Sequence, residues 1–202
     1  MDNITKCLMA CSLVFCLIDS KAQSKHDNLE VLHTSYDVVV AGATPGGLAV
    51  GIRCAREGYS VLIVDPMGHI GGMISGGLGT MDTYYYKARS PIYDELCHRI
   101  VSHYKGLVFD RSEFKRQNVG EHLRFESHVA EMALNNMVSA EKNMTVVLGF
   151  YPKTLERTRS EMRSVRFSLM NNDSSFIATA RIFVDATYEG DLAALAGVPY
   201  RV

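Results

Sequence analysis

The fold is decided by one stretch of the chain, Tyr36 to Gly47, which reads YDVVVAGATPGG. Its apolar run predicts a buried strand, and the glycines with Pro45 predict a tight turn into a helix that continues to Gly58. A second apolar run, Val61 to Asp65, predicts another strand that ends in a carboxylate. In this order, backbone N–H groups and the positive end of a helix meet at the turn and suit the pyrophosphate of a dinucleotide. The carboxylate of Asp65 suits the hydroxyls of a ribose.

The composition sets the size and class of the protein. The chain has 202 residues, of which 47% are hydrophobic and 21% charged, enough to bury a core of one domain or slightly more. Its formal net charge is -1, and positive and negative residues are interspersed. This distribution lacks the basic patch of a nucleic-acid-binding protein, so no nucleic-acid partner is expected. Because the chain as a whole is nearly neutral, an anionic ligand must be bound by groups within its own site.

The N-terminal segment differs from the rest of the chain. Lys6 precedes the apolar run Cys7 to Ile18, which is followed by the small and polar residues Ser20 to Gln23. This order predicts a secretory signal peptide over residues 1–23 and a secreted or periplasmic protein. The apolar run is too short to span a bilayer comfortably, so no stable membrane span is expected after cleavage. A buried amphipathic helix and an uncleaved anchor remain the alternatives.

The domain division follows from this signal. Residues 24–35 are predicted to be a polar leader, and residues 36–202 a single ligand-binding domain. Three of the five cysteines lie in the predicted signal peptide, which leaves Cys54 and Cys97. Two cysteines make neither a disulfide framework nor the ligand set of a zinc or iron–sulfur site, so no metal is expected. Cys54 is expected to be a packed structural thiol.

The rest of the chain alternates helical and extended patterns. Ser90 and Pro91 predict a helix start, and a second helix is expected over Val119 to Glu141. After Met144 the pattern becomes that of short strands, with Pro152 as one of the breaks between them. The expected strands are Val146–Phe150, Thr154–Arg159, Val165–Met170 and Phe176–Ala180. Strands alternating with helices predict an α/β fold.

A second cluster of small and polar residues follows the strand Arg181 to Asp185. The turn after this strand opens a new helix with Asp191 in its first turn. Such a turn can direct backbone N–H groups and a carboxylate at a ligand. Plain helix capping by Asp191 is the alternative explanation.

Four blocks of sequence together resemble a known family. They are Gly42 to Gly47 with Gly58, Val61 and Asp65; His69 to Gly79; Arg124 to Glu131; and Asp185 to Asp191. The blocks resemble the FAD-dependent oxidoreductases with a glutathione-reductase-like flavin domain, including relatives labelled xanthan-lyase-like or heterodisulfide-reductase-subunit-A-like. The resemblance implies a Rossmann-like FAD/NAD(P)-binding domain with a parallel central sheet and an antiparallel β-meander, and FAD as the cofactor. Some relatives carry iron–sulfur clusters, but the two remaining cysteines of this chain cannot bind one.

The resemblance also implies roles for individual residues. The pyrophosphate turn comprises Gly42, Thr44, Pro45, Gly46 and Gly47, and Asp65 accepts hydrogen bonds from the adenosine ribose. The flavin side of the cofactor is assigned to Gly71, Gly72 and Met73. The pyrophosphate and ribityl parts are approached from the opposite direction by Asp185, Thr187, Gly190 and Asp191. Tyr151 is assigned to the adenine.

Three positions depart from the common fingerprint of this turn. Thr44 replaces the second glycine, and its Cβ is expected to hinder the closest approach of backbone to pyrophosphate. Gly51 stands where alanine is usual, and Asp65 where glutamate is usual, which shortens the reach to the ribose by one methylene. A lower flavin affinity than usual is therefore expected.

The expected activity is transfer of a hydride or two electrons through the flavin, on an unknown small molecule. No catalytic acid or base is assigned, although His69 and Tyr84 to Tyr86 lie near the flavin-side block. The alternatives are a nicotinamide-dependent dehydrogenase and a non-catalytic dinucleotide-binding remnant. The chain is also expected to be an N-terminal piece of a longer protein, because relatives continue into a substrate domain.

Overall fold

The computed structural model describes residues 35–82, 89–105, 122–159, 161–170, 174–199 and 201. Residues 35–202 form one unit. The predicted signal peptide, the rest of the leader up to Thr34, and Tyr84 to Tyr86 lie outside the described residues. Ser35, which the sequence analysis placed in the leader, is the first residue of strand β1.

A parallel sheet forms the centre of the unit. Its strands are β1 (Ser35–Ala41), β2 (Val61–Asp65), β5 (Met144–Leu148) and β8 (Ser175–Asp185). They lie in the order β5-β2-β1-β8, and each neighbouring pair is parallel. All five residues of β2 are buried, which agrees with its continuous apolar sequence. The expected parallel α/β sheet is therefore confirmed.

An antiparallel meander continues this sheet. Its strands are β6 (Phe150–Thr158), β7 (Glu161–Leu169) and the first half of β8, paired in the order β8-β7-β6. Phe176 of β8 packs edge-on against Phe150, with ring centroids 5.2 Å apart, and stacks on Phe167 at 5.5 Å. These three rings form the apolar layer of the meander, which confirms the expected β-meander.

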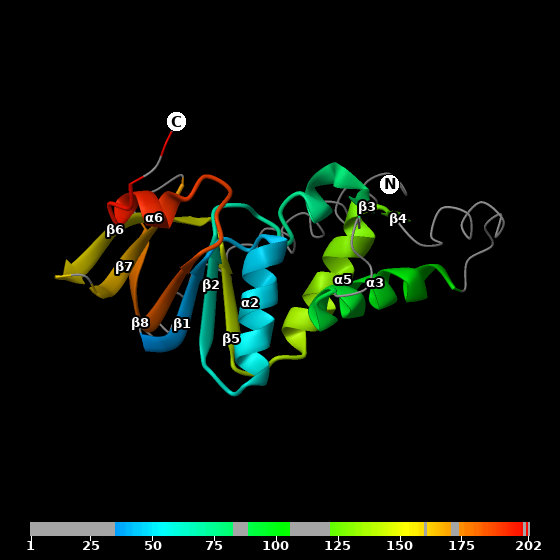
Figure 1. Cartoon of the computed structure of the whole chain (residues 1–202), viewed down its shortest axis with the longest axis horizontal. Coiled ribbons are helices and arrows are strands. Elements are labelled where there is room, and N and C mark those ends of the chain that lie inside the picture. The colour runs from blue at the N-terminus through cyan, green and yellow to red at the C-terminus, as the bar shows by residue number, and fades with distance from the viewer. Residues whose placement is uncertain are drawn as a thin grey trace, which may run out of the picture. The chain divides into compact units, whose positions relative to one another are not determined.

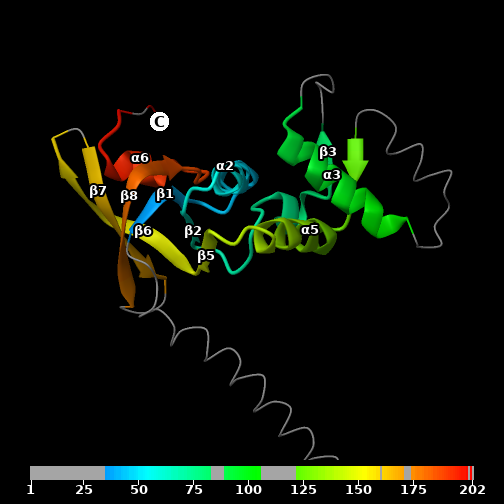
Figure 2. The ribbon, with the colours of Figure 1, turned by 90° about the horizontal axis from the view of Figure 1, so that it is seen from below.

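The helices bury their apolar faces in a common core. They are α2 (Pro45–Arg56), α3 (Pro91–Tyr104) and α5 (Ser127–Ser139). Both views place α2 between the meander on one side and α3 with α5 on the other (Figures 1 and 2). Leu48 and Ile52 of α2 share one buried cluster with Ile63 of β2, Ile100 of α3 and Met137 of α5. This packing anchors the first turn of α2 against the sheet.

Short elements complete the unit. They are the π-helical turn η2 (Ile74–Leu78), the antiparallel pair β3 (Thr80–Asp82) and β4 (His122–Arg124), and helix α6 (Asp191–Leu195). Gly77 within η2 has a φ of +123°, so the turn is kinked at this residue. None of these short elements except the start of α6 was expected from the sequence.

The helix expected over Val119 to Glu141 is wrong in its first part. Residues His122 to Arg124 pair with β3 instead, and the helix begins at Ser127. The residue before the helix, Glu126, has extended backbone, and its N–H donates to the Tyr104 hydroxyl at 3.0 Å. A tertiary strand pairing therefore overrides the local helical pattern.

The strand boundaries also differ from the expected ones. The predicted strand Val146 to Phe150 is two strands, because Gly149 turns the chain with a φ of +87° and donates its N–H to the Met67 carbonyl at 3.2 Å. Pro152 lies inside β6 instead of breaking it, since a bulge in the β6–β7 register falls at this residue. The segments predicted separately over Phe176 to Ala180 and Arg181 to Asp185 form the single strand β8.

Candidate cofactor-binding site

The two sequence clusters meet at the carboxyl edge of the sheet. Ala41, the last residue of β1, lies opposite Asp185, the last residue of β8. The Ala186 N–H donates to the Ala41 carbonyl at 2.8 Å, and on the other side the Gly42 N–H donates to the Val64 carbonyl at 2.7 Å. The turn after β1 and the loop after β8 therefore lie in direct contact, although more than 140 positions separate them in the sequence.

Glycine is required where these segments touch. Gly42 has a φ of +104°, and a Cβ on it would lie 2.6 Å from the Ala186 carbonyl oxygen and 2.9 Å from the Thr187 nitrogen. A Cβ on Gly47 would overlap the carbonyl oxygen of Gly42. The first and third glycines of the fingerprint thus allow the turn, α2 and the β8 loop to approach one another closely.

Thr44 joins the two segments through its side chain. It is the N-cap of α2, and its hydroxyl oxygen accepts a hydrogen bond from the Gly47 N–H at 3.2 Å. The same hydroxyl donates to the Ala186 carbonyl at 2.8 Å. Thr44 is buried, so neither bond is exchanged easily for water. The residue that replaces the usual glycine therefore has a structural role that the sequence did not indicate.

Thr44→Val is expected to lower the free energy of unfolding by about 1–3 kcal/mol, because valine keeps the shape but loses both hydrogen bonds. The change is measured as a shift of the urea midpoint. Thr154→Val, at an exposed position of β6, serves as the matched control. Thr44→Ser should retain most of the stability, and equal stability of Thr44→Val and wild type would contradict the bridging role.

Asp65 holds the glycine turn at the end of β2. Its side chain is buried, and its Oδ2 accepts from the Ala43 N–H at 2.6 Å while Oδ1 accepts from the Met67 N–H at 2.7 Å. Each carboxylate oxygen has a second lone pair, so a ribose hydroxyl can still donate to it. The ribose role of Asp65 remains a prediction, and its bond to the turn is an additional role.

The loop after β8 is organised around the carboxylate of Asp185. Oδ1 accepts from the N–H and the hydroxyl of Thr187, at 3.0 and 2.7 Å, and Oδ2 accepts from the Ala193 N–H at 2.7 Å. The Thr187 hydroxyl oxygen in turn accepts from the Asp191 N–H at 2.9 Å. Gly190 has a φ of +72° and is the N-cap residue of α6. The four residues predicted from this loop thus form one connected structure.

Burial raises the pKa of Asp191, and the negative charges of Asp185 and Glu189 raise it further. The folded protein therefore binds a proton at Asp191 more readily than the unfolded chain. Stability is lost as the pH rises from the unfolded pKa through the folded pKa. The charge of Asp191 thus opposes folding at neutral pH.

Asp191→Asn is expected to raise the urea midpoint at pH 7, with the gain shrinking as the pH falls through the raised pKa of Asp191, where the carboxylate becomes protonated. The backbone bond from the residue 191 N–H to Thr187 is kept in this variant. Urea titrations across the pH range check the result. A gain that is independent of pH would show that the charge is not the cause.

The residues predicted for the flavin side, Gly71 to Met73, lie next to the glycine turn. The Gly71 N–H donates to the Ala43 carbonyl at 2.8 Å, and Gly71 and Gly72 have φ values of +97° and +51°. We call Gly71 to Met73 the flavin-side turn. The Met73 N–H donates to the hydroxyl oxygen of Tyr188 at 2.8 Å, which ties this turn to the β8 loop. Sequence reasoning missed Tyr188, whose signal was an aromatic residue within a turn of small and polar ones.

A groove brings the predicted residue Tyr151 together with Asp191. It has a volume of about 740 Å³ and lies where the ends of β2 and β6 approach α6. Its lining residues are Pro66, Tyr151, Pro152, Met170, Asp191, Ala194 and Leu195. Tyr151 therefore lines the same groove as Asp191 and Pro66, the residue that follows Asp65, and its contact with adenine remains a prediction.

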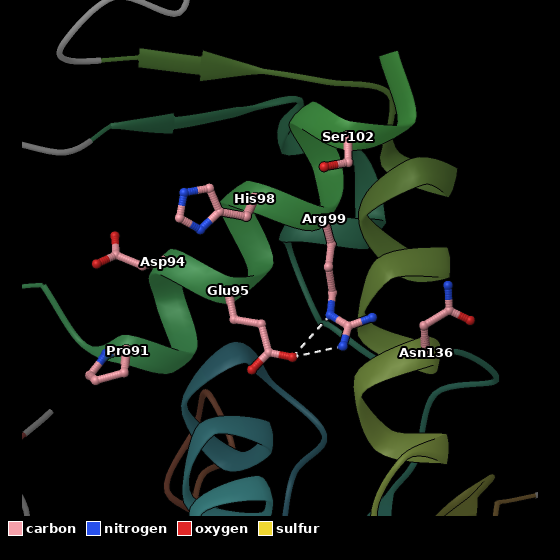
Figure 3. A pocket seen from close by; sticks show the side chains of 7 residues that line it. All are labelled: Pro91, Asp94, Glu95, His98, Arg99, Ser102 and Asn136. Atoms are coloured by element: carbon pink, nitrogen blue, oxygen red, sulfur yellow. Dashed lines mark hydrogen bonds and ion pairs between the residues drawn. The ribbon is translucent and has the colours of Figure 1, made fainter. Parts of the chain in front are cut away.

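A second groove of about 690 Å³ lies between α3 and α5. Figure 3 shows Asp94, His98 and Ser102 along α3, with Asn136 on α5. Glu95 in this groove accepts from Arg56 of α2 at 2.8 Å and from Arg99, and these contacts, that of Arg56 first, lower its pKa. The ion pair between Glu95 and Arg56 joins α3 to α2 at the edge of this groove.

The described residues contain no group of His, Cys, Asp or Glu side chains that could hold a metal ion. Within the same ranges, no helix has the length and apolar character needed to cross a membrane. Cys54 and Cys97 are free, half-buried thiols, and burial raises the pKa of Cys97.

Known proteins share this fold. The structure of THI4 from Thermovibrio ammonificans superposes with a TM-score of 0.55 at 18% identity, over 98% of this chain and 73% of that one. Glycerol-3-phosphate dehydrogenase from Bacillus halodurans, solved in complex with FAD, gives a TM-score of 0.54 at 11% identity, over 81% of this chain and 37% of that one. At these identities the similarity shows the fold.

Sequence comparison gives the family. A vinyl phenol reductase from Lactiplantibacillus plantarum is 38% identical over 60 residues, which are 29% of this chain, and the match spans only 12% of that protein's length. The family described as FAD dependent oxidoreductase matches residues 37–202. Since this match covers most of the sequence and all of the site above, the chain belongs to the FAD dependent oxidoreductase family, whose cofactor is FAD.

Proposed function

We propose that residues 35–202 form the FAD-binding domain of an oxidoreductase that acts on a small molecule. The observation that carries this proposal is the junction of the two turns, where the Thr44 hydroxyl bonds Gly47 on one side and Ala186 on the other. This junction places the start of α2 and the β8 loop around one edge of the sheet, the position at which open α/β sheets bind dinucleotides.

The residues at this edge fit the diphosphate of FAD. Within the described ranges the Gly46 N–H, at the start of α2, has no hydrogen-bond acceptor. A Cβ on Gly46 would meet no atom closer than 3.9 Å, so this side of the turn is open. An unpaired N–H at the positive end of a helix is a suitable donor to a phosphate oxygen.

FAD, when bound, supplies the transfer of a hydride or an electron pair. The chain's own residues hold and orient it: the turn after β1 receives the diphosphate, Asp65 the ribose, and Gly71 to Met73 the flavin side. Asp185 keeps the β8 loop in place from the opposite direction. No acid or base is assigned, although His69 lies within 3.1 Å of the Ser75 hydroxyl beside the flavin-side turn.

The proposal is tested by titrating the purified protein with FAD and recording flavin absorbance and fluorescence. Saturable binding with a changed flavin spectrum is expected. Binding of NADH without FAD would favour a nicotinamide-dependent dehydrogenase, and binding of neither would favour the non-catalytic alternative. Dithionite reduction of the bound flavin, followed by reoxidation with an acceptor dye, then tests electron transfer.

We also propose export of the protein, on the basis of the sequence of residues 1–23. Expression in a Gram-negative host should place the mature protein in the periplasm, with an N-terminus near residue 24. Leu13→Arg, which interrupts the apolar run, should leave the full-length protein in the cytoplasm. Cytoplasmic wild-type protein that retains residues 1–23 would overturn this proposal.

A further inference from the structure

We propose that Tyr188 is a positioning residue that holds the flavin-side turn in the shape that receives FAD. The inference rests on the function proposed above and adds a residue that neither the glycine fingerprint nor the resemblance assigned. It concerns the contact between two segments separated by 115 positions, the β8 loop and the turn Gly71 to Met73.

The contact has a polar and a steric part. The Tyr188 hydroxyl accepts the Met73 N–H at 2.8 Å. The same hydroxyl lies where a side chain on Gly72 would be, because a Cβ there would overlap the phenol oxygen and approach ring atoms Cζ and Cε2 to 3.0 and 3.2 Å. Gly72 also has a φ of +51°. The phenol therefore fills the space next to Gly72, and its hydroxyl also fixes the backbone N–H of the following residue, Met73.

The backbone around Tyr188 is held on both sides. Thr187 donates its N–H and its hydroxyl to Asp185, and its hydroxyl oxygen accepts from the Asp191 N–H. These bonds close a small ring of the loop around Tyr188. A side chain that projects from a fixed loop can impose a position on the segment it contacts.

The exposure of Tyr188 indicates that it contributes little to the core. Its relative exposure is 58%, and Met73 is equally exposed at 59%. An aromatic ring that remains mostly in water gains little free energy from burial. Loss of its hydroxyl should therefore leave global stability unchanged and affect the position of the turn.

Tyr188→Phe separates an effect on the position of the turn from an effect on global stability, because it removes the hydroxyl and keeps the ring. In the apoprotein, hydrogen exchange at the Met73 amide should become about tenfold faster, since the N–H loses its acceptor. FAD should bind about tenfold more weakly, with a shifted visible absorption maximum, while the urea midpoint stays the same. Tyr59→Phe, at another exposed tyrosine, is the matched control and should change none of these quantities.

The outcomes distinguish this inference from the proposed function. Wild-type protein that binds no FAD would overturn the proposed function and, with it, the role of the turn. Wild-type protein that binds FAD, together with a Tyr188→Phe variant of unchanged affinity, spectrum and Met73 exchange, would overturn the role of Tyr188 alone.

A double-mutant cycle tests the steric part. Gly72→Ala should weaken FAD binding strongly when Tyr188 is present, because the new methyl group displaces the phenol. In the Tyr188→Ala background the same substitution should cost much less affinity. Equal fold-losses in the two backgrounds would show that the two residues act independently and would overturn the proposed contact.

Discussion

Gly47→Ala is expected to lower the free energy of unfolding by about 3 kcal/mol or more and to abolish FAD binding. The added methyl group would overlap the Gly42 carbonyl oxygen and lie 3.0 Å from the Ala186 Cβ. The backbone of the turn cannot retreat, because the Gly42 N–H is bonded to Val64 at 2.7 Å and the Ala43 N–H to Asp65 at 2.6 Å. Helix α2 must therefore move away from the turn. Urea unfolding and FAD titration measure the two effects.

Two other glycines of α2 provide matched controls for the same substitution. Gly46→Ala should fold with near-normal stability, since its methyl group would have no neighbour closer than 3.9 Å. Gly51→Ala should also be tolerated, because its methyl group would meet the ends of the Ile63 and Met144 side chains, which can move. Alanine also favours a helix over glycine by about 1 kcal/mol. Equal stability of all three variants would contradict the close approach at Gly47.

The sequence predicted those parts of the site where the local conformation and the expected ligand require the same residue types. The turn after β1 needs glycine at Gly42 for its positive φ, and the strand before it is apolar because it is buried on both faces. The order of strand, turn, helix and strand is therefore visible in the residues themselves. The same holds for the start of α3, where Ser90 and Pro91 form a recognisable N-terminus.

The sequence did not predict contacts between segments that are far apart along the chain. The bond between Thr44 and Ala186 and the bond between Met73 and Tyr188 depend on how β1 and β8 are paired, which no local pattern records. The strand at His122 to Arg124 was missed for the same reason, since its pairing with β3 decides its conformation. Pro152 was read as a strand break because the bulge that accommodates it is a property of the pair β6–β7.

Asp185→Asn is expected to be the most damaging change in the β8 loop, with a loss of about 2–4 kcal/mol in the free energy of unfolding. Both carboxylate oxygens act as acceptors here, for the donors of Thr187 and for the Ala193 N–H. An amide offers one acceptor oxygen and one donor group, so at least one N–H would face another donor. The start of α6 and the loop that contacts Gly42 would both lose their anchor.

The effect of Asp185→Asn on FAD binding follows from the same geometry. A loop that must be ordered again when the cofactor binds uses part of the binding free energy, and about 3 kcal/mol corresponds to a loss of about 100-fold in affinity. Glu189→Gln is the matched control, because it removes a neighbouring exposed carboxylate of the same loop. That variant should keep its FAD affinity, and its urea midpoint should stay the same or rise slightly, because it removes a charge that repels Asp191. If Asp185→Asn matched Glu189→Gln in both measurements, the carboxylate of Asp185 would not be the group that orders the loop.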